Sequence, residues 1–491
     1  MEKPQPSPAA APMTAPRRRR SRPLLLLLAL TVAAGALGAV WLTLSARRAP
    51  AVPVRPAPGP PRAAVALSAL TSGAPAALPE LTAVIGDRRR FTRAHPGDAL
   101  AWAQLGAAYV ERGRRVDAAD FPAAEEALRT SLRLRPRDNA DALTGLAELA
   151  DQRRDFPEGR ARGEEALKLA PGRPAAYGAL IDACAGLGDQ KAAQSTLEKL
   201  LRLPHSPAVR ARTAAVYWDR GWREDAAVEL SDAAAAATAP AERAAYLARY
   251  GRMAWERGDF PASLRSFDEA LRLDRDQPDA LAGRARTLAS LGRTGQALDA
   301  YRRALAARPA PETLLELGEL LESLGRAAQA RTQYGLLRTR VSQDAVAGVD
   351  GELVLGRLEA DHGDAGSAVR RLRAEWKRQP GTAVADALGW ALHRTGNDEE
   401  ALTFATTATE ETKGGGAPVA LYTYHRGAIE AALGAPGAAR RHLQEALRTD
   451  PAFSPLWAPR ARAALAALGE PSPADAPAGV KLAAGAAPRP S

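Results

Sequence analysis

Apolar residues recur at helical spacing along most of the chain, in stretches of about 12–14 residues that each end at a glycine. A small residue follows each glycine by five positions, and a large apolar residue usually follows four positions later. Successive glycines are separated by 33, 37, 34, 33, 38, 33 and 38 residues. These glycines are Gly188, Gly221, Gly258, Gly292, Gly325, Gly363, Gly396 and Gly434. A period of this length predicts an array of repeated structural units.

Each unit is expected to contain two helices joined at the glycine. Glycine ends the first helix by adopting a backbone conformation that other residues disfavour. A proline often closes the unit. These prolines are Pro136, Pro171, Pro309, Pro380 and Pro451. The unit near 140–173 departs from the pattern, because Arg154 occupies the glycine position. Since neither helix can bury its apolar face alone, neighbouring units must stack.

One unit carries the fullest set of recurring residues. They are Trp102, Leu105, Gly106, Tyr109 and Gly113, followed by Ala124, Leu128, Ser131 and Pro136. In this order the residues resemble the pattern of the tetratricopeptide repeat (TPR) family. The resemblance implies an all-α fold, a right-handed α-solenoid of helix-turn-helix repeats, with about ten repeats over 99–453. We expect an N-terminal capping helix at 80–98 and a C-terminal capping helix at 454–468.

The N-terminal segment reads as a membrane anchor. A basic tail at 1–22 precedes an uncharged segment at 23–46, which as a helix would cover ~30–35 Å and cross a bilayer. The arginine cluster before this segment predicts a cytoplasmic N-terminus and an extracytoplasmic repeat domain. A cleaved signal peptide, which would release a secreted protein, is the alternative. Small residues in the segment also leave open a weak self-association of the membrane helices.

Two segments rich in proline and alanine flank the repeats, at 47–79 and 469–491. Segments of this composition bury too little apolar surface to fold, and their prolines keep them extended. We therefore expect a linker between the membrane and the repeats, and a disordered C-terminal tail.

The charge of the chain is concentrated at its N-terminal end. The chain has 491 residues and a formal charge of +11, and residues 1–62 contain ten basic groups and one acidic group. The rest of the chain is nearly neutral and offers no basic surface for phosphates, so no nucleic acid partner is expected. Arginine outnumbers lysine by 60 to 7, which is typical of the codon usage of a high-GC (actinobacterial) bacterial genome.

Motifs for catalysis or cofactor binding do not occur in the sequence. The phosphate-binding loop, the dinucleotide fingerprint, the HExxH zinc motif and the GxSxG elbow are all missing. The six histidines are not paired at ligand spacing. The single cysteine, Cys184, excludes internal disulfides and is expected to be a buried apolar residue. We therefore expect no enzymatic activity, cofactor, metal or small-molecule substrate.

The resemblance also implies that the first helix of each repeat lines a concave groove. Its exposed positions are acidic early in the array, with Glu148, Asp151 and Asp182. The residues expected to bind a protein or peptide are Trp218, Arg252, Trp255, Arg286, Arg357, Trp390, His393 and Tyr424. Tryptophan, tyrosine and arginine concentrate binding energy at interfaces. The alternative is that the charged residues are only solvated and the tryptophans pack between repeats.

These observations predict a membrane-anchored, extracytoplasmic scaffold that binds a protein or peptide partner through its concave groove. A second interpretation is a structural or assembly factor of an envelope complex without a dedicated peptide ligand. The repeat fold does not distinguish between them, because solenoids serve many unrelated partners.

Overall fold

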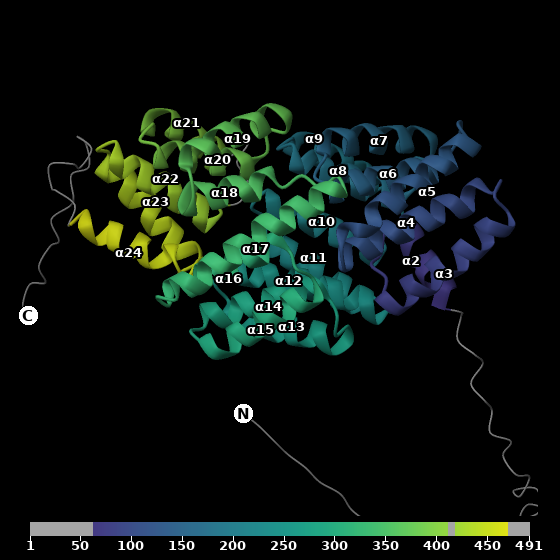
Figure 1. Cartoon of the computed structure of the whole chain (residues 1–491), viewed down its shortest axis with the longest axis horizontal. Helices are drawn as coiled ribbons and strands as arrows, with labels where there is room; N and C mark the ends of the chain where they lie inside the picture. Colours follow the sequence, from purple (N-terminus) through teal and green to yellow (C-terminus); the bar gives the residue numbers. More distant parts are fainter. Residues whose placement is uncertain (1–61, 411–417, 470–491) are drawn as a thin grey trace, which may run out of the picture. The chain divides into compact units, whose positions relative to one another are not determined.

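The computed structural model describes residues 62–410 and 418–469. This part of the chain contains 23 α-helices, α2 to α24, one short 3₁₀ helix, η1 (Ala118–Asp120), and no strand (Figure 1). The expected all-α solenoid is thereby confirmed. The predicted basic tail, membrane segment and C-terminal tail lie outside the described residues. No helix among the described residues is long and apolar enough to cross a membrane.

Ten consecutive helix pairs make up the array, and they are numbered here as repeats 1 to 10. The pairs are α4 (Ala99–Arg115) with α5 (Phe121–Leu134), α6 (Ala140–Gln152) with α7 (Phe156–Leu169), α8 (Pro174–Gly186) with α9 (Gln190–Leu200), α10 (Pro207–Asp219) with α11 (Arg223–Ala236), α12 (Pro240–Glu256) with α13 (Phe260–Leu273), α14 (Pro278–Ser290) with α15 (Thr294–Ala307), α16 (Pro311–Ser323) with α17 (Ala327–Val346), α18 (Glu352–His362) with α19 (Ala365–Arg378), α20 (Thr382–Arg394) with α21 (Asp398–Thr409), and α22 (Ala420–Ala432) with α23 (Pro436–Thr449).

The turns within the repeats use the backbone conformation that the glycines predict. Seven of the eight marker glycines have φ between 69° and 82°, the left-handed region. Gly363 is the exception, with φ −154°. In repeat 2, where the glycine is missing, Arg154 adopts the same left-handed conformation with φ 60°. The turn is therefore kept there at a cost of about 1–2 kcal/mol for a residue with a Cβ.

Close packing of the two helices of a repeat depends on small residues. The small residues five positions after the glycines are buried, as at Ala193, Ala226 and Ser263. Glycines on the first helices allow the same close approach between neighbouring repeats: an added Cβ on Gly283 of α14 would overlap the ring of Phe267, a fully buried side chain of α13 in the preceding repeat. The helices therefore approach so closely that a methyl group does not fit.

Replacing Gly283 by alanine is expected to lower the stability by about 1–3 kcal/mol, since the buried Phe267 ring, 1% exposed, would have to shift. The matched control is Gly295→Ala on α15, where an added Cβ meets no atom within 4 Å. This control is expected to be neutral or stabilising, because alanine favours the helix over glycine. Urea denaturation followed by circular dichroism measures both variants. Equal midpoints would contradict the packing argument.

The linker expected at 47–79 is shorter than predicted. Helix α2 (Arg62–Ser72) lies inside it, and α3 (Leu78–Ala94) stands where the capping helix was expected. The sequence of α2 consists of alanine, leucine and other residues that a helix tolerates, and its Ala66 is fully buried against α3 and α4. Most prolines of the segment 47–79 precede this helix, so the composition of the segment as a whole did not reveal a helix within it. At the other end, α24 (Trp457–Ala467) closes the array.

Repeats that lie far apart in the sequence touch each other, because the solenoid coils back on itself; each full coil is called here a turn of the solenoid. The short loop between the two helices of repeat 2 lies against the connection that follows repeat 7, where the Asp350 amide donates to the Arg153 carbonyl oxygen over 2.9 Å. The turn inside repeat 3 meets the connection after repeat 8, so that an added Cβ on Gly188 would stand 3.0 Å from the Pro380 carbonyl oxygen. Repeat 5 meets the connection after repeat 10 in the same way, through Gly258. Five repeats therefore separate elements that are in contact.

Candidate protein-binding face

Charged side chains from the first helices of repeats 1 to 6 converge on a common interior. We call these side chains the inner face: Glu111, Arg114, Glu148, Asp151, Asp182, Arg212, Asp219, Arg249, Arg252, Glu256, Asp279 and Arg286. Their proximity is evident from mutual effects on pKa. Arg114 of repeat 1 helps to lower the pKa of Asp279 of repeat 6, against the effect of burial. Burial, together with the neighbouring Arg212, lowers the pKa of Arg249.

Several charges of the inner face are neutralised within the chain. Arg114 donates to Glu111 over 2.7 Å, and Arg212 is paired with Asp182. Arg286 of α14 holds the Glu316 carboxylate of the next repeat through two nitrogens, at 2.6 and 3.1 Å. The Arg212 and Arg286 pairs join helices of neighbouring repeats, whereas the Arg114 pair lies within α4, and together they use up most of the basic groups.

Four carboxyl groups of the inner face have no such partner; three of them have a raised pKa, whereas the surrounding arginines lower the pKa of the fourth, Asp279, against the effect of burial. Among the described residues, none forms a hydrogen bond or ion pair with the side chains of Glu148, Asp151 or Asp219. Burial raises the pKa of Glu148 to about 7 and that of Asp219 to about 6, and it raises the pKa of Asp151 well above its usual range. Neighbouring acids, Glu111 beside Glu148 and Asp182 beside Asp151, add to the shift. Uncompensated acids of this kind are typical of functional sites.

The residues predicted in the middle of the array lie on or beside the inner face. Trp255 donates through Nε1 to the Ser290 hydroxyl over 2.9 Å, and the Arg286 guanidinium lies 5.0 Å from its ring centroid. Arg252 is exposed and pairs with Glu256, one helical turn further along, over 2.8 Å. The structure therefore brings these three predicted residues, Arg252, Trp255 and Arg286, together.

Two further predicted residues contact groups outside this cluster. The Trp218 ring on α10 lies under the Arg223 guanidinium, 4.9 Å from its centroid. Arg357 on α18 donates to the Tyr422 hydroxyl over 3.4 Å. A role of these residues in binding stays a prediction.

The aromatic residues predicted late in the array are placed differently. Trp390 and Tyr424 are each 5% exposed and belong to the hydrophobic core of the last repeats, with Trp457 of α24. The Trp390 ring stacks on His425 at 4.1 Å, and its Nε1 donates to an Asp361 carboxylate oxygen over 3.0 Å. These side chains fill the space where the prediction had placed an open groove, because the first helices of repeats 9 and 10 and α24 come together there.

His393 lies at the edge of this aromatic core. Its Nδ1 is 2.5 Å from the Asp398 carboxylate at the start of the following helix. Cys184 is 1% exposed in the core of repeat 3, as expected, and burial raises the pKa of its thiol to about 11. A thiol in this state is not a nucleophile at neutral pH. No group of histidine, cysteine, aspartate and glutamate within the described ranges could hold a metal ion.

The sequence argument missed Arg212, Arg249 and Asp219. It selected a few positions on each first helix; Asp219 directly follows the predicted Trp218, and Arg249 stands three residues before the predicted Arg252. A simpler signal was available: charged residues repeat at intervals of three or four along the first helices, as in Arg249, Arg252 and Glu256.

Glu319 offers a test of burial on the inner side of repeat 7. Burial, with a contribution from the nearby Asp361 charge, raises the pKa of Glu319 to about 8. The folded chain therefore prefers protonated Glu319, and stability is lost as the pH rises from the unfolded value near 4.5 to about 8. Glu319→Gln is expected to raise the denaturation midpoint at pH 8 and to leave it unchanged at pH 4. Glu198→Gln, on an exposed position, is the control. A pH-independent difference would contradict the argument.

Comparison with known proteins supports the fold. The family model of the tetratricopeptide repeat matches residues 114–174, 250–310 and 282–344. No curated protein sequence matches the chain. Similar solved structures include the human IFIT1 dimer with PPP-AAAA, at 15% identity and a TM-score of 0.43, covering 63% of this chain and 72% of that one. A tetratricopeptide repeat protein from Parabacteroides merdae is 19% identical, with a TM-score of 0.32, covering 53% of this chain and 98% of that one.

A third similar structure is the APC/C hetero-tetramer Cut9-Hcn1, at 16% identity and a TM-score of 0.35, covering 75% of this chain and 63% of that one. Identities and TM-scores of this size carry no information on ligands. The family model therefore shows tetratricopeptide repeats over residues 114–174 and 250–344 of this all-α array of helix pairs with glycine turns.

Proposed function

We propose that the chain is a scaffold for protein–protein interaction and that its inner face binds a partner segment carrying basic side chains. The observation that carries the proposal is the set of three unpaired carboxyl groups, Glu148, Asp151 and Asp219, on first helices of repeats 2 and 4. A lysine or arginine side chain of the partner would supply the cationic hydrogen-bond donor that these carboxyl groups lack within the chain. Charge-assisted hydrogen bonds of this kind contribute about 1.5–3 kcal/mol each.

The charge distribution disfavours a nucleic acid at the same place. Nucleic acid binding depends on neutralising phosphates with basic groups. Most arginines of the inner face are already paired with carboxylates, as Arg212 is with Asp182, and the groups without a partner are four acids and one arginine, Arg249. Phosphates would therefore be repelled where a basic peptide is attracted.

The proposal is tested with the full chain in detergent micelles and three fluorescent peptides of equal length, rich in lysine, glutamate or serine. Fluorescence anisotropy is expected to show binding of the lysine-rich peptide only. The double variant Glu148→Gln, Asp219→Asn is expected to weaken it by roughly tenfold. The matched control is Glu126→Gln, Glu269→Gln, which removes two carboxylates of second helices, one exposed and one partly exposed. Equal binding of the three peptides, or equal weakening by both double variants, would refute the proposal.

We further propose that the segment 23–46 anchors the chain in the cell membrane, with the N-terminus cytoplasmic and the repeats extracytoplasmic. Support comes from the uncharged sequence of this segment and the arginines that precede it. A reporter that is active only outside the cytoplasm, fused after Ser491, is expected to be active. Activity of a reporter that works only in the cytoplasm would overturn the orientation. The mass of the membrane-bound protein distinguishes an intact anchor from a cleaved signal peptide.

A further inference from the structure

We infer that a polar clasp between successive turns of the solenoid keeps the coil closed, and that a partner reaches the inner face after this clasp opens. The clasp itself is argued from contacts within the chain. Its regulatory effect rests on the proposed function, because it concerns access to the same inner face.

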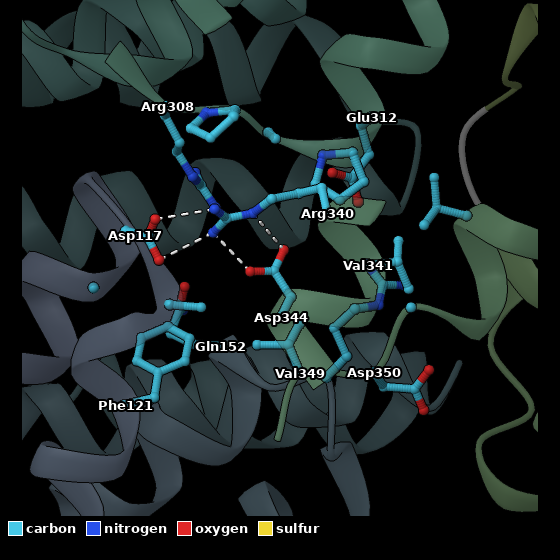
Figure 2. Close-up of a pocket in the computed structure, with 18 of the residues that line it drawn as sticks. Asp117, Phe121, Gln152, Arg308, Glu312, Arg340, Val341, Asp344, Val349 and Asp350 are labelled. Carbon is cyan, nitrogen blue, oxygen red and sulfur yellow. Dashed lines mark hydrogen bonds and ion pairs between the residues drawn. The ribbon is translucent and has the colours of Figure 1, made fainter. Parts of the chain in front are cut away.

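Arg340 of α17 is the central residue of the clasp. Its Nη1 and Nη2 each donate to the Asp117 carboxylate over 3.0 Å, and its Nε donates to Asp344 over 3.1 Å. Asp117 belongs to the connection inside repeat 1, whereas Arg340 and Asp344 belong to repeat 7 (Figure 2). These hydrogen bonds from Arg340 hold the pKa of Asp117 below its usual range. One guanidinium group thus joins two turns of the coil.

A cavity of about 240 Å³ lies beside this guanidinium group. Phe121 and Gln152 of the early repeats line one side, and Val341 and Val349, from α17 and the connection after it, line the other (Figure 2). Apolar groups from the two turns therefore line the cavity, and Val349 also packs against the cluster that contains Phe121. Across the cavity itself, the dispersion contacts that would help to hold the turns together are missing.

We call the line of contacts between the two turns of the solenoid the seam. The contact next to the clasp along this seam is also polar. Arg153, at the turn of repeat 2, donates through Nε to the Ala347 carbonyl oxygen over 2.8 Å and through Nη1 to Glu125 over 2.7 Å. Most of the large apolar clusters lie within neighbouring repeats, and Ala347 and Val349 are the members that reach across this part of the seam. Polar interfaces within a chain permit relative movement, whereas large apolar ones do not.

One contact between the turns is a buried ion pair, and we infer that the turns separate about this point. Arg115, at the end of α4, is 1% exposed and pairs with Asp274, 10% exposed, at the end of α13 over 2.5 Å. A buried ion pair is costly to break, because each charge would be left without compensation. The seam therefore opens at the exposed Asp117 side before it opens at Asp274.

The ends of the array offer no easier route to the inner face. Near the beginning, the end of α2 lies over Glu148 and Arg212, and Ser72 and Gly73 line a small cavity with them. Near the end, the aromatic core around Trp390 fills the inner side. A polypeptide segment does not pass between turns that are in contact, so it enters when they separate.

The test compares Asp117→Asn with Asp120→Asn in the full chain. Asparagine at 117 can still accept from the Ala119 amide, as Asp117 does over 2.9 Å, while the charge that holds Arg340 is removed. Asp120 pairs with Arg112 inside repeat 1 over 2.6 Å, so its variant removes a similar ion pair that does not join the turns. Spin labels at Ala123→Cys on α5 and Thr339→Cys on α17, both exposed, report the distance between the turns.

Asp117→Asn is expected to raise the population with long inter-label distances by roughly tenfold, and to speed binding of the lysine-rich peptide severalfold, whereas Asp120→Asn changes neither. Equal thermal melts of the two variants exclude general unfolding. Unchanged inter-label distances in Asp117→Asn would refute the inferred clasp, regardless of the rate of peptide binding. A longer distance without faster binding would overturn the gating and leave the clasp standing. Failure of the unmodified chain to bind any peptide would instead refute the proposed function.

Discussion

Replacing Trp390 by alanine is expected to destabilise the last three repeats by about 3–5 kcal/mol. The side chain is 5% exposed and packs against His425 and Trp457, whose ring centroids are 4.1 and 5.7 Å away. Its removal leaves a cavity and also deprives the Asp361 carboxylate of its hydrogen-bond donor. Hydrogen exchange of repeats 8 to 10, combined with urea denaturation, measures the loss repeat by repeat. Local readout is needed because a repeat array does not unfold as one unit.

The matched control for this prediction is Trp222→Ala. Trp222 is 43% exposed at the turn of repeat 4 and contacts Tyr217 edge-on and the Arg220 guanidinium. Its loss is expected to cost about 1 kcal/mol, in line with exposed aromatic and cation–π contacts. If Trp390→Ala instead left stability intact and abolished only the binding of a partner, the residue would belong to a binding surface, as the sequence pattern suggested.

Local features of the fold were predictable because they depend on residues close in the sequence. A glycine every 33–38 residues marks each turn, and the structure gives seven of the eight marker glycines a left-handed backbone. In repeat 2, which has no glycine at the turn, Arg154 adopts the same left-handed conformation. The inner positions of Arg252, Trp255 and Arg286 follow from helical spacing in the same way.

Contacts between turns could not be predicted from the repeat pattern. Whether Asp117 of repeat 1 meets Arg340 of repeat 7 depends on the small rotation from each repeat to the next, added up over six steps, and the period of the sequence does not contain this angle. Trp390 and Tyr424 are buried for a more local reason, since the repeat pattern does not place the closing helix α24 against the last two repeats. The prediction assumed an open groove, whereas these side chains contact Trp457 of α24.

Replacing Asp274 by alanine is expected to destabilise the chain by about 3–5 kcal/mol, because it leaves the Arg115 guanidinium buried without a counter-charge. The Nε and Nη1 atoms of Arg115 already have no hydrogen-bond partner, so no second acceptor is at hand. Asp268→Ala, which removes an exposed carboxylate paired with Arg284 over 2.6 Å, is the matched control and is expected to cost under about 1 kcal/mol. Urea denaturation measures both.

The double variant Arg115→Met, Asp274→Leu separates the cost of an unpaired charge from the value of the pair itself. Apolar side chains of similar size need no counter-charge, so most of the stability lost in Asp274→Ala is expected to return. Recovery would show that the ion pair serves to hold repeat 1 in position against the end of repeat 5 rather than to add stability. A double variant as unstable as Asp274→Ala would show instead that the pair itself stabilises the coil. Either result determines how firmly the turns are fixed at the point about which the Asp117 side is inferred to open.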